Sequence, residues 1–105
     1  MSALATNQRQ ESKPFKPQER ASNVLKAMGN EHRLKILCHL SRTEASVKEL
    51  EVLTGLSQSA LSQHLAKLRQ ERLVKTRRHA QTIYYSLEGP VAMEILQALK
   101  SARLI

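Results

Sequence analysis

Hydrogen-bonding side chains line one face of the segment from Gly55 to Leu73. Leu61, Leu65 and Leu68 have the i, i+4, i+7 spacing of one helix face, and Ser57 precedes them as an N-cap. At about 100° per residue, the opposite face collects small or polar side chains and no acid. These residues are Ser59, Ser62, Gln63, Ala66, Lys67 and Gln70. Hydroxyl and amide groups bind base edges in the DNA major groove and lysine binds phosphate, so this face favours a recognition helix.

An ordinary solvated helix is the alternative for this segment. Exposed helix faces commonly pair Glu with Lys four residues apart, whereas the first acid after Ser57 is Glu71, at the far end. The polar face therefore favours recognition over a plain surface helix.

The positive charge of the chain is concentrated in the same region. The 105 residues include 17 Lys and Arg against 9 Asp and Glu, a formal net charge of +8. From Ser57 to Tyr85, Glu71 is the one acid among basic residues that leave a net charge of +5. These residues are Lys67, Arg69, Arg72, Lys75, Arg77 and Arg78. Such a surface favours nucleic acid, although a membrane surface or an acidic protein would also accept the charge.

The elements that must position this face are helices with recognisable ends. Apolar spacing predicts helices at residues 19–28, 31–40 and 46–53 and from 90 to about 102. Asn30 can cap the second helix, and Ser46 with Glu49 has the spacing of a capping box at the third. The third helix, a short turn containing Gly55 and the polar helix form a helix-turn-helix, in which the first helix braces the second.

A basic β-hairpin is predicted directly after the polar helix. Residues 74–78 and 82–87 alternate with period 2, and residues 79–81 join them. A hairpin in this place is a wing, which can lie on the DNA backbone or in the minor groove, although charged edges also protect sheets from edge pairing. The candidate contacts at its tip are Arg77, Arg78, His79 and Gln81. The expected fold is mainly α with a small β-hairpin, a winged helix-turn-helix.

One domain with a short arm fits the length of the chain. Residues 1–18 are polar, contain Pro14 and Pro17 and lack a helical period, so they are predicted to be a disordered N-terminal arm before a domain at 19–105. The last helix carries more apolar residues than one small domain needs, and the first and last helices are the candidates for an interface. We therefore expect a homodimer through these helices, which matches a palindromic DNA site.

A single cysteine, Cys38, excludes an intrachain disulfide, and without a signal-type segment or a run of 18 apolar residues we expect a cytoplasmic protein. Among Ile36, Leu37 and Leu40, Cys38 is either an unreactive buried residue or a one-thiol redox sensor. We expect no enzyme activity and no cofactor, because clustered carboxylates, a phosphate loop and a Cys–His pair are absent from the sequence.

Several segments together resemble the ArsR family of winged-helix bacterial repressors, over roughly residues 21–102. Residues 25–28 followed by 31–38 are similar to the family's second-helix signature. Residues 56–65 resemble its recognition helix, and residues 74–87, with Tyr85, resemble its wing. Within the family the chain resembles the HlyU-like and BigR-like branch, whose members regulate virulence or sulfur-stress genes.

The resemblance implies a homodimer that binds an imperfect inverted repeat in a promoter. By position it carries over a set of groove-facing or backbone-contacting residues: Gln58, Ser59, Ser62, Gln63 and His64. Residues 49–53 lack the Cys-x-Cys of metal-sensing members, and the last helix lacks His, Asp and Cys, so no metal switch of the usual family type is expected. Thiol-sensing relatives have a second cysteine near the end of the last helix, which residues 101–105 lack.

The sequence therefore predicts a dimeric, sequence-specific DNA-binding regulator, either a repressor or an anti-silencing activator, that is open to modulation through Cys38. Its expected phosphate contacts are Lys67, Arg69, Arg77 and Arg78. The alternative is a winged-helix protein-interaction module without sequence-specific DNA binding. A protein-binding face is expected to present aromatic or large aliphatic anchors, which the polar helix face lacks.

Overall fold

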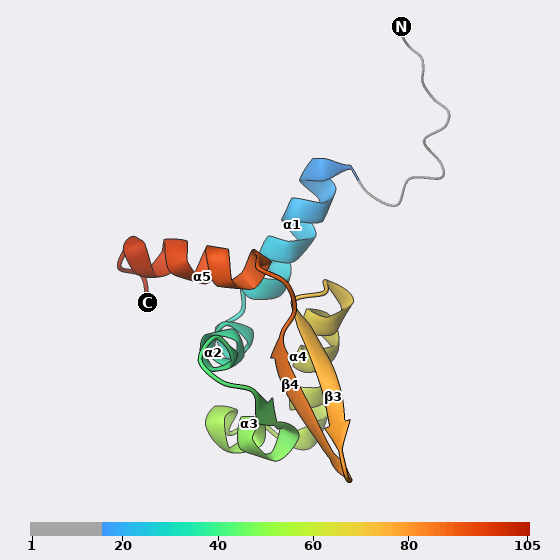
Figure 1. The fold of residues 1–105 in the computed structure, drawn as a ribbon. Helices are drawn as coiled ribbons and strands as arrows, with labels where there is room; N and C mark the ends of the chain where they lie inside the picture. Colours follow the sequence, from blue (N-terminus) through green and yellow to red (C-terminus); the bar gives the residue numbers. More distant parts are fainter. Residues whose placement is uncertain (1–15) are drawn as a thin grey trace, which may run out of the picture.

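The computed structural model describes residues 16–105 and contains helices packed around a small antiparallel sheet (Figure 1). In chain order the elements are α1 (Pro17–Met28), α2 (Glu31–Leu40), β2 (Ala45–Ser46), α3 (Val47–Thr54), α4 (Gln58–Gln70), β3 (Val74–His79), β4 (Thr82–Leu87) and α5 (Val91–Ser101). Figure 1 shows α2, α3, α4 and the hairpin grouped together, with α1 and α5 diverging from one end of this group. The predicted winged helix-turn-helix is confirmed.

Side-chain caps fix the helix-turn-helix. Ser46 Oγ accepts a hydrogen bond from the Glu49 N–H at 3.1 Å while the Glu49 carboxylate accepts from the Ser46 N–H at 2.7 Å, which is the predicted capping box. α3 ends at Gly55, whose φ of 70° lies in the left-handed region that glycine adopts without strain. Ser57 Oγ then accepts from the Ala60 N–H at 3.2 Å and starts α4. The turn between the two helices is thus set by local chemistry.

Two helix ends differ slightly from the prediction. α1 begins at Pro17 instead of at residue 19, because the fixed φ of proline suits the first turn of a helix. α5 begins at Val91, with Pro90 as its N-cap residue. Of the predicted arm at residues 1–18, only residues 16–18 lie in the described part, and two of these belong to α1.

The sheet contains one strand that the sequence analysis missed. Its strand order is β2-β4-β3, and β2 pairs Ala45 with Tyr85 and Ser46 with Tyr84. Two residues are too short to show an alternating pattern. The pairing ties the start of α3 to the hairpin, so the first helix of the motif and the wing form one unit.

The hydrophobic core lies where α2, α3, α4 and the hairpin meet. Leu61, Leu65 and Leu68 are buried, as their spacing predicts. The side chains with no exposed surface include Ile36, Leu37, Leu50, Leu61, Leu68 and Leu73. α1 adds Val24, Ala27 and Met28, and α5 adds Ala92 and Leu96. Burying aliphatic side chains of this size stabilises the fold by about 1.5–3 kcal/mol each, which fixes the polar face of α4 outward.

Across residues 16–105, no helix has both the length and the apolar character needed to cross a bilayer.

Candidate nucleic-acid interface

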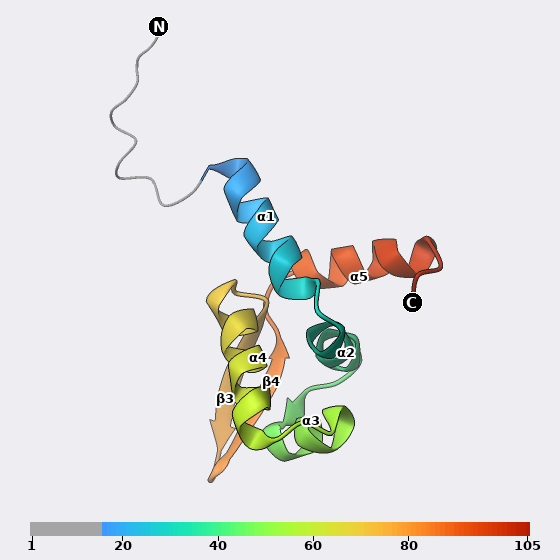
Figure 2. The same cartoon turned by 180° about the vertical axis from the view of Figure 1, so that it is seen from behind.

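The polar face of α4 is open to solvent. Figure 2 shows α4 on the outside of the group of helices, in front of the hairpin. The exposed side chains on this helix are Gln58, Ser59, Ser62, Gln63, Ala66, Lys67, Arg69 and Gln70. α2 and α3 pack behind the helix. A helix that is braced from behind and polar in front has the geometry that places side chains in a major groove.

An open groove joins the beginning of α4 to the hairpin. It has a volume of about 570 Å³. Its lining comes from the end of β2, the start of α3, the first residue of α4, the hairpin turn and β4: Ser46, Val47, Lys48, Glu49, Gln58, Gln81, Thr82, Ile83 and Tyr84. Two predicted contacts that are far apart in the sequence, Gln58 and Gln81, therefore border the same groove. Lys48 was missed by the sequence analysis, because its position on α3 gives no periodic signal.

Three of the four predicted contacts on the wing are exposed, and the fourth forms an ion pair within the protein. Arg78, His79 and Gln81 are exposed near the turn, where Ala80 has a φ of 56°. Arg77 instead forms an ion pair with Glu44, in which its Nε donates to the carboxylate at 2.9 Å. The guanidinium also lies 4.6 Å from the centre of the Tyr84 ring.

The hydrogen bond from Arg77 lowers the pKa of the Glu44 carboxyl, and the carboxylate raises the pKa of Arg77. Glu44 therefore stays ionised and offsets one of the wing's positive charges. Sequence analysis missed Glu44, which is 33 residues from its partner and outside every predicted element.

His64 occupies the flank of α4 rather than its exposed face. Its ring is half-buried, and Nδ1 lies 3.0 Å from Nη1 of Arg33 on α2. The His32 ring is 5.5 Å away, centre to centre. Burial lowers the pKa of His64, and the positive charges of Arg33 and His32 lower it further. The nitrogen bonded to Arg33 is engaged within the protein, which leaves Nε2 as the atom that can contact another group.

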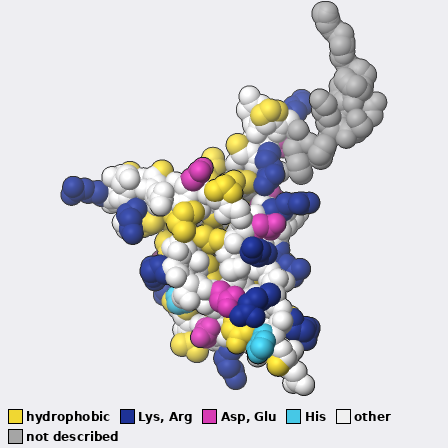
Figure 3. Space-filling view, viewed as in Figure 1, with side chains coloured by type: hydrophobic (Ala, Val, Ile, Leu, Met, Phe, Trp, Pro, Cys, Tyr) yellow, Lys and Arg dark blue, Asp and Glu magenta, His cyan; other side chains and the backbone are white. Residues whose placement is uncertain are grey.

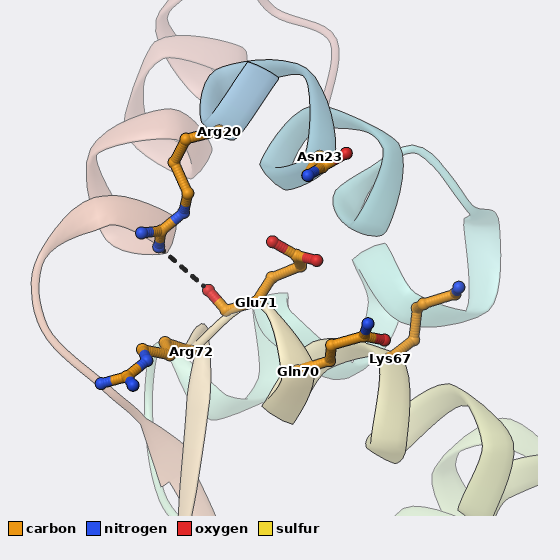
Figure 4. Close-up of a pocket in the computed structure, with 6 residues that line it drawn as sticks. All are labelled: Arg20, Asn23, Lys67, Gln70, Glu71 and Arg72. Carbon is orange, nitrogen blue, oxygen red and sulfur yellow. Dashed lines mark hydrogen bonds between the residues drawn. The ribbon is translucent and has the colours of Figure 1, made fainter. Parts of the chain in front are cut away.

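The C-terminal end of α4 meets α1 at a pocket of about 310 Å³ (Figure 4). Its lining residues are Arg20, Asn23, Lys67, Gln70, Glu71 and Arg72. Figure 4 shows Arg20 reaching from α1 to the backbone carbonyl of Glu71, to which its guanidinium donates at 3.2 Å. The predicted DNA contact Lys67, and Gln70 of the same polar face, thus lie where α1 braces the end of the recognition helix.

Cys38 lies on α2 facing α5. The thiol is half-buried, and it borders a cavity of about 230 Å³ between the two helices. The other lining residues are Ser41, Arg42, Met93, Leu96, Gln97, Lys100 and Ile105. Cys38 is therefore at the rim of the core, and its neighbours include two basic side chains. Within residues 16–105, no group of three or more His, Cys, Asp or Glu side chains could hold a metal ion.

Large apolar side chains remain exposed on the elements predicted to form the dimer. Figure 3 shows hydrophobic side chains gathered in the angle between α1 and α5. The exposed large hydrophobic residues on α1, α5 and the C-terminal residues are Leu25, Val91, Leu104 and Ile105. Leu25, which belongs to the apolar pattern of α1, is 57% exposed. Contiguous exposed apolar surface marks an interaction site.

Comparison with known proteins identifies the family. Residues 30–76 match the model of the bacterial regulatory protein arsR family, a segment that runs from the α2 cap into the wing. The chain is 54% identical over 81 residues to the nodulation protein NolR of Rhizobium meliloti, covering 77% of this chain and 66% of NolR. It is 53% identical over 76 residues to the transcriptional activator HlyU of Vibrio cholerae, covering 72% of this chain and 70% of HlyU. The chain thus spans about two thirds of the length of these curated relatives.

Solved structures agree with the sequence relatives. HlyU from Vibrio cholerae superposes with a TM-score of 0.79 at 47% identity, covering 86% of this chain and 98% of that chain. The transcriptional repressor BigR from Xylella fastidiosa superposes with a TM-score of 0.75 at 36% identity, covering 81% of this chain and 87% of that chain. The expected resemblance to the HlyU-like and BigR-like branch is confirmed, because the chain is similar both to HlyU and to BigR. With its cap, helix-turn-helix and wing in the matched order, the chain belongs to the ArsR family of bacterial regulatory proteins.

Proposed function

We propose that this protein is a homodimeric, sequence-specific DNA-binding transcriptional regulator that recognises an imperfect inverted repeat in a promoter. The observation that carries the proposal is the acid-free, exposed face of α4, held outward by three buried leucines and flanked by a basic hairpin. In a dimer through α1 and α5, two such faces read two half-sites of one duplex.

The residues divide by the kind of contact they make. Gln58, Ser59, Ser62 and Gln63 are assigned to the major groove, where amides and hydroxyls reach base edges. Lys67, Arg69, Arg78 and the tip residues His79 and Gln81 are assigned to the backbone or minor groove, and Arg77 joins them if phosphate displaces Glu44. Regulation follows from occupancy of the promoter in the bacterial cytoplasm, and no catalytic step is needed.

A winged-helix protein-interaction module is less well supported. The relatives HlyU and BigR are named as a transcriptional activator and a transcriptional repressor, and the exposed face of α4 carries no aromatic or large aliphatic anchor.

A binding titration tests the proposed function. The full-length protein is titrated with its own promoter and with a scrambled duplex of the same length and composition, at low and moderate salt. We expect tight, promoter-selective binding, with specific affinity at least about a thousandfold above non-specific affinity. Equal affinity for both duplexes at both salt concentrations would support the interaction module instead.

Arg78→Ala is expected to weaken binding to promoter and scrambled DNA alike and to lower the salt slope by about one unit per protomer, because each protomer loses one phosphate contact and the counterion it releases. Arg77→Ala is the matched control on the same strand: Glu44 already offsets its charge, so its effect on the slope is smaller. The check is a plot of log affinity against log salt for each variant. An unchanged slope in Arg78→Ala removes Arg78 from the phosphate contacts.

The position of Cys38 also favours modulation through its thiol. The cavity beside it lies between α2 and α5, so an added oxygen, sulfur or mixed disulfide at this sulfur would press on the proposed dimer helix. That displacement would alter the spacing of the two recognition helices.

Peroxide or persulfide treatment is expected to weaken promoter binding by the wild-type protein and to leave Cys38→Ser unaffected. The check is the same titration before and after treatment, followed by reduction to test for recovery. If the wild type and Cys38→Ser respond alike, Cys38 is a packing residue and another group senses the oxidant.

A further inference from the structure

Arg33 is bonded to two neighbouring helices at once. Its Nε donates to the backbone carbonyl of Ala27 at 2.5 Å and its Nη2 donates to that of Lys26 at 3.3 Å, both in the last turn of α1. The last carbonyls of a helix lack the i+4 partner that the interior ones have, and here the Lys26 carbonyl also accepts from the Gly29 N–H at 3.3 Å, so Arg33 adds to the C-cap of α1 from its place on α2. Its remaining terminal nitrogen, Nη1, reaches Nδ1 of His64 on α4 at 3.0 Å. One side chain thus joins α1, α2 and the recognition helix.

The bond to Arg33 sets the protonation state of His64. A guanidinium carries only donors, so Nδ1 must be the acceptor, and the neutral ring then carries its proton on Nε2. An imidazolium has a proton on both nitrogens. It cannot accept from Arg33, and its charge would lie 3.0 Å from a second cation. The three-helix connection therefore exists only while His64 is neutral.

The surroundings reinforce this requirement. His32 lies on the same side of α2, with its ring 5.5 Å from that of His64, and no acidic side chain is bonded to either His64 or Arg33 within residues 16–105. A cavity of about 170 Å³ beside Arg33 is lined by Asn23, Lys26, Ala27, Arg33, Lys67 and Glu71. Glu71 is the one acidic residue in this lining. α3 and β3 also pack against α4, but the described charges that act on His64 are those of Arg33 and His32.

We propose that Arg33 is a positioning residue for DNA recognition, which holds α4 through neutral His64 and releases it when His64 takes up a proton. This inference rests on the proposed function, because the face that α4 presents is the DNA-reading face. It assigns to His64 a role within the protein, in place of the groove or backbone contact that the family resemblance implies, for which phosphate is the acidic partner. The two roles predict opposite effects of acid: a phosphate contact strengthens when His64 becomes charged, whereas the hold on α4 weakens.

His64→Asn is the variant that separates these roles, since the Asn Oδ1 can accept from Arg33 in place of Nδ1 but cannot be protonated. Promoter affinity is measured from about pH 7.5 to about pH 5.5, where histidine titrates. At the upper pH we expect His64→Asn to bind within about twofold of the wild type. At the lower pH we expect the wild type to bind about tenfold more weakly than His64→Asn, a difference of about 1.4 kcal/mol.

Two further variants complete the design. His39→Asn removes a histidine from the opposite end of α2, so its affinity relative to the wild type should not change with pH. Arg33→Lys keeps the charge but cannot span three acceptors, and it should lose about tenfold in affinity at about pH 7.5 and most of the acid sensitivity. A wild-type to His64→Asn affinity ratio that is constant with pH, or that rises in acid, overturns the proposal.

Spectroscopy and stability provide readouts that do not require DNA. The ring nitrogens of His64 should show the Nε2–H tautomer by ¹⁵N NMR, and the Nδ1–H tautomer would contradict the geometry. Because folding lowers the pKa of His64, the unfolded chain binds the proton more tightly, so stability falls as the pH drops below the ordinary value of 6.5. In His64→Asn, the part of this acid-induced loss of stability that comes from His64 should be absent. If promoter selectivity is absent at about pH 7.5, the proposed function fails. The NMR and stability measurements still test the bond between Arg33 and neutral His64.

Discussion

Leu25→Glu is expected to convert the protein from a dimer to a monomer and to lower promoter affinity by at least about a hundredfold, because a second half-site is then no longer bound by a linked partner. Leu25 is 57% exposed on α1, and α1 is one of the two helices that flank the apolar surface in Figure 3. A carboxylate at a buried contact between two copies must be desolvated without a partner, which opposes association. Sedimentation velocity measures the mass, and the promoter titration measures the affinity.

Val52→Glu is the matched control for this change. Val52 on α3 is 82% exposed, so both substitutions place a carboxylate on an exposed aliphatic position and have a similar effect on the isolated fold. We expect Val52→Glu to remain a dimer. A Leu25→Glu variant that sediments as a dimer would place the interface elsewhere, and monomers in both variants would indicate that any added charge prevents association.

Gln63→Ala is expected to cost about 1–3 kcal/mol in binding to the promoter and little in binding to scrambled DNA, since an amide that reads a base edge contributes only at the correct base pair. Gln63 is exposed near the middle of α4, and the buried Leu61 and Leu65 on either side fix its direction. Truncation removes only the amide, so folding and dimerisation should be unchanged.

The measurement is a pair of titrations, with promoter and scrambled duplex, repeated on promoters that carry single base changes. Specificity should relax at one position in each half-site. Gln97→Ala removes the same amide from an exposed position on α5, away from the DNA-reading face, and should relax specificity at no base pair. If Gln63→Ala weakens both duplexes equally, Gln63 contacts the backbone rather than a base.

The helices and the polar face were determined by the sequence because their signals are local. Leucines at i, i+4 and i+7 predict the buried side of α4 and leave Gln63 and Lys67 exposed, as observed. Asn30, Ser46 and Ser57 cap the helices that follow them, since a side-chain oxygen bonds an N–H only two or three residues away. The basic hairpin followed from period-2 alternation, and its register is set by the short turn at residues 80–81.

Tertiary structure alone decided which of the candidate contacts are free. Glu44 and Arg77, and likewise Arg33 and His64, come from separate elements more than 30 residues apart, so no spacing rule connects them. The strand β2 exists only because Ala45 and Ser46 lie beside β4, which no pattern in two residues reveals. Leu25 follows the apolar spacing of its helix, yet it is exposed because the core covers the side of α1 that carries Val24, Ala27 and Met28. Periodicity specifies which face of a helix is apolar, and the packing of distant elements determines what covers that face.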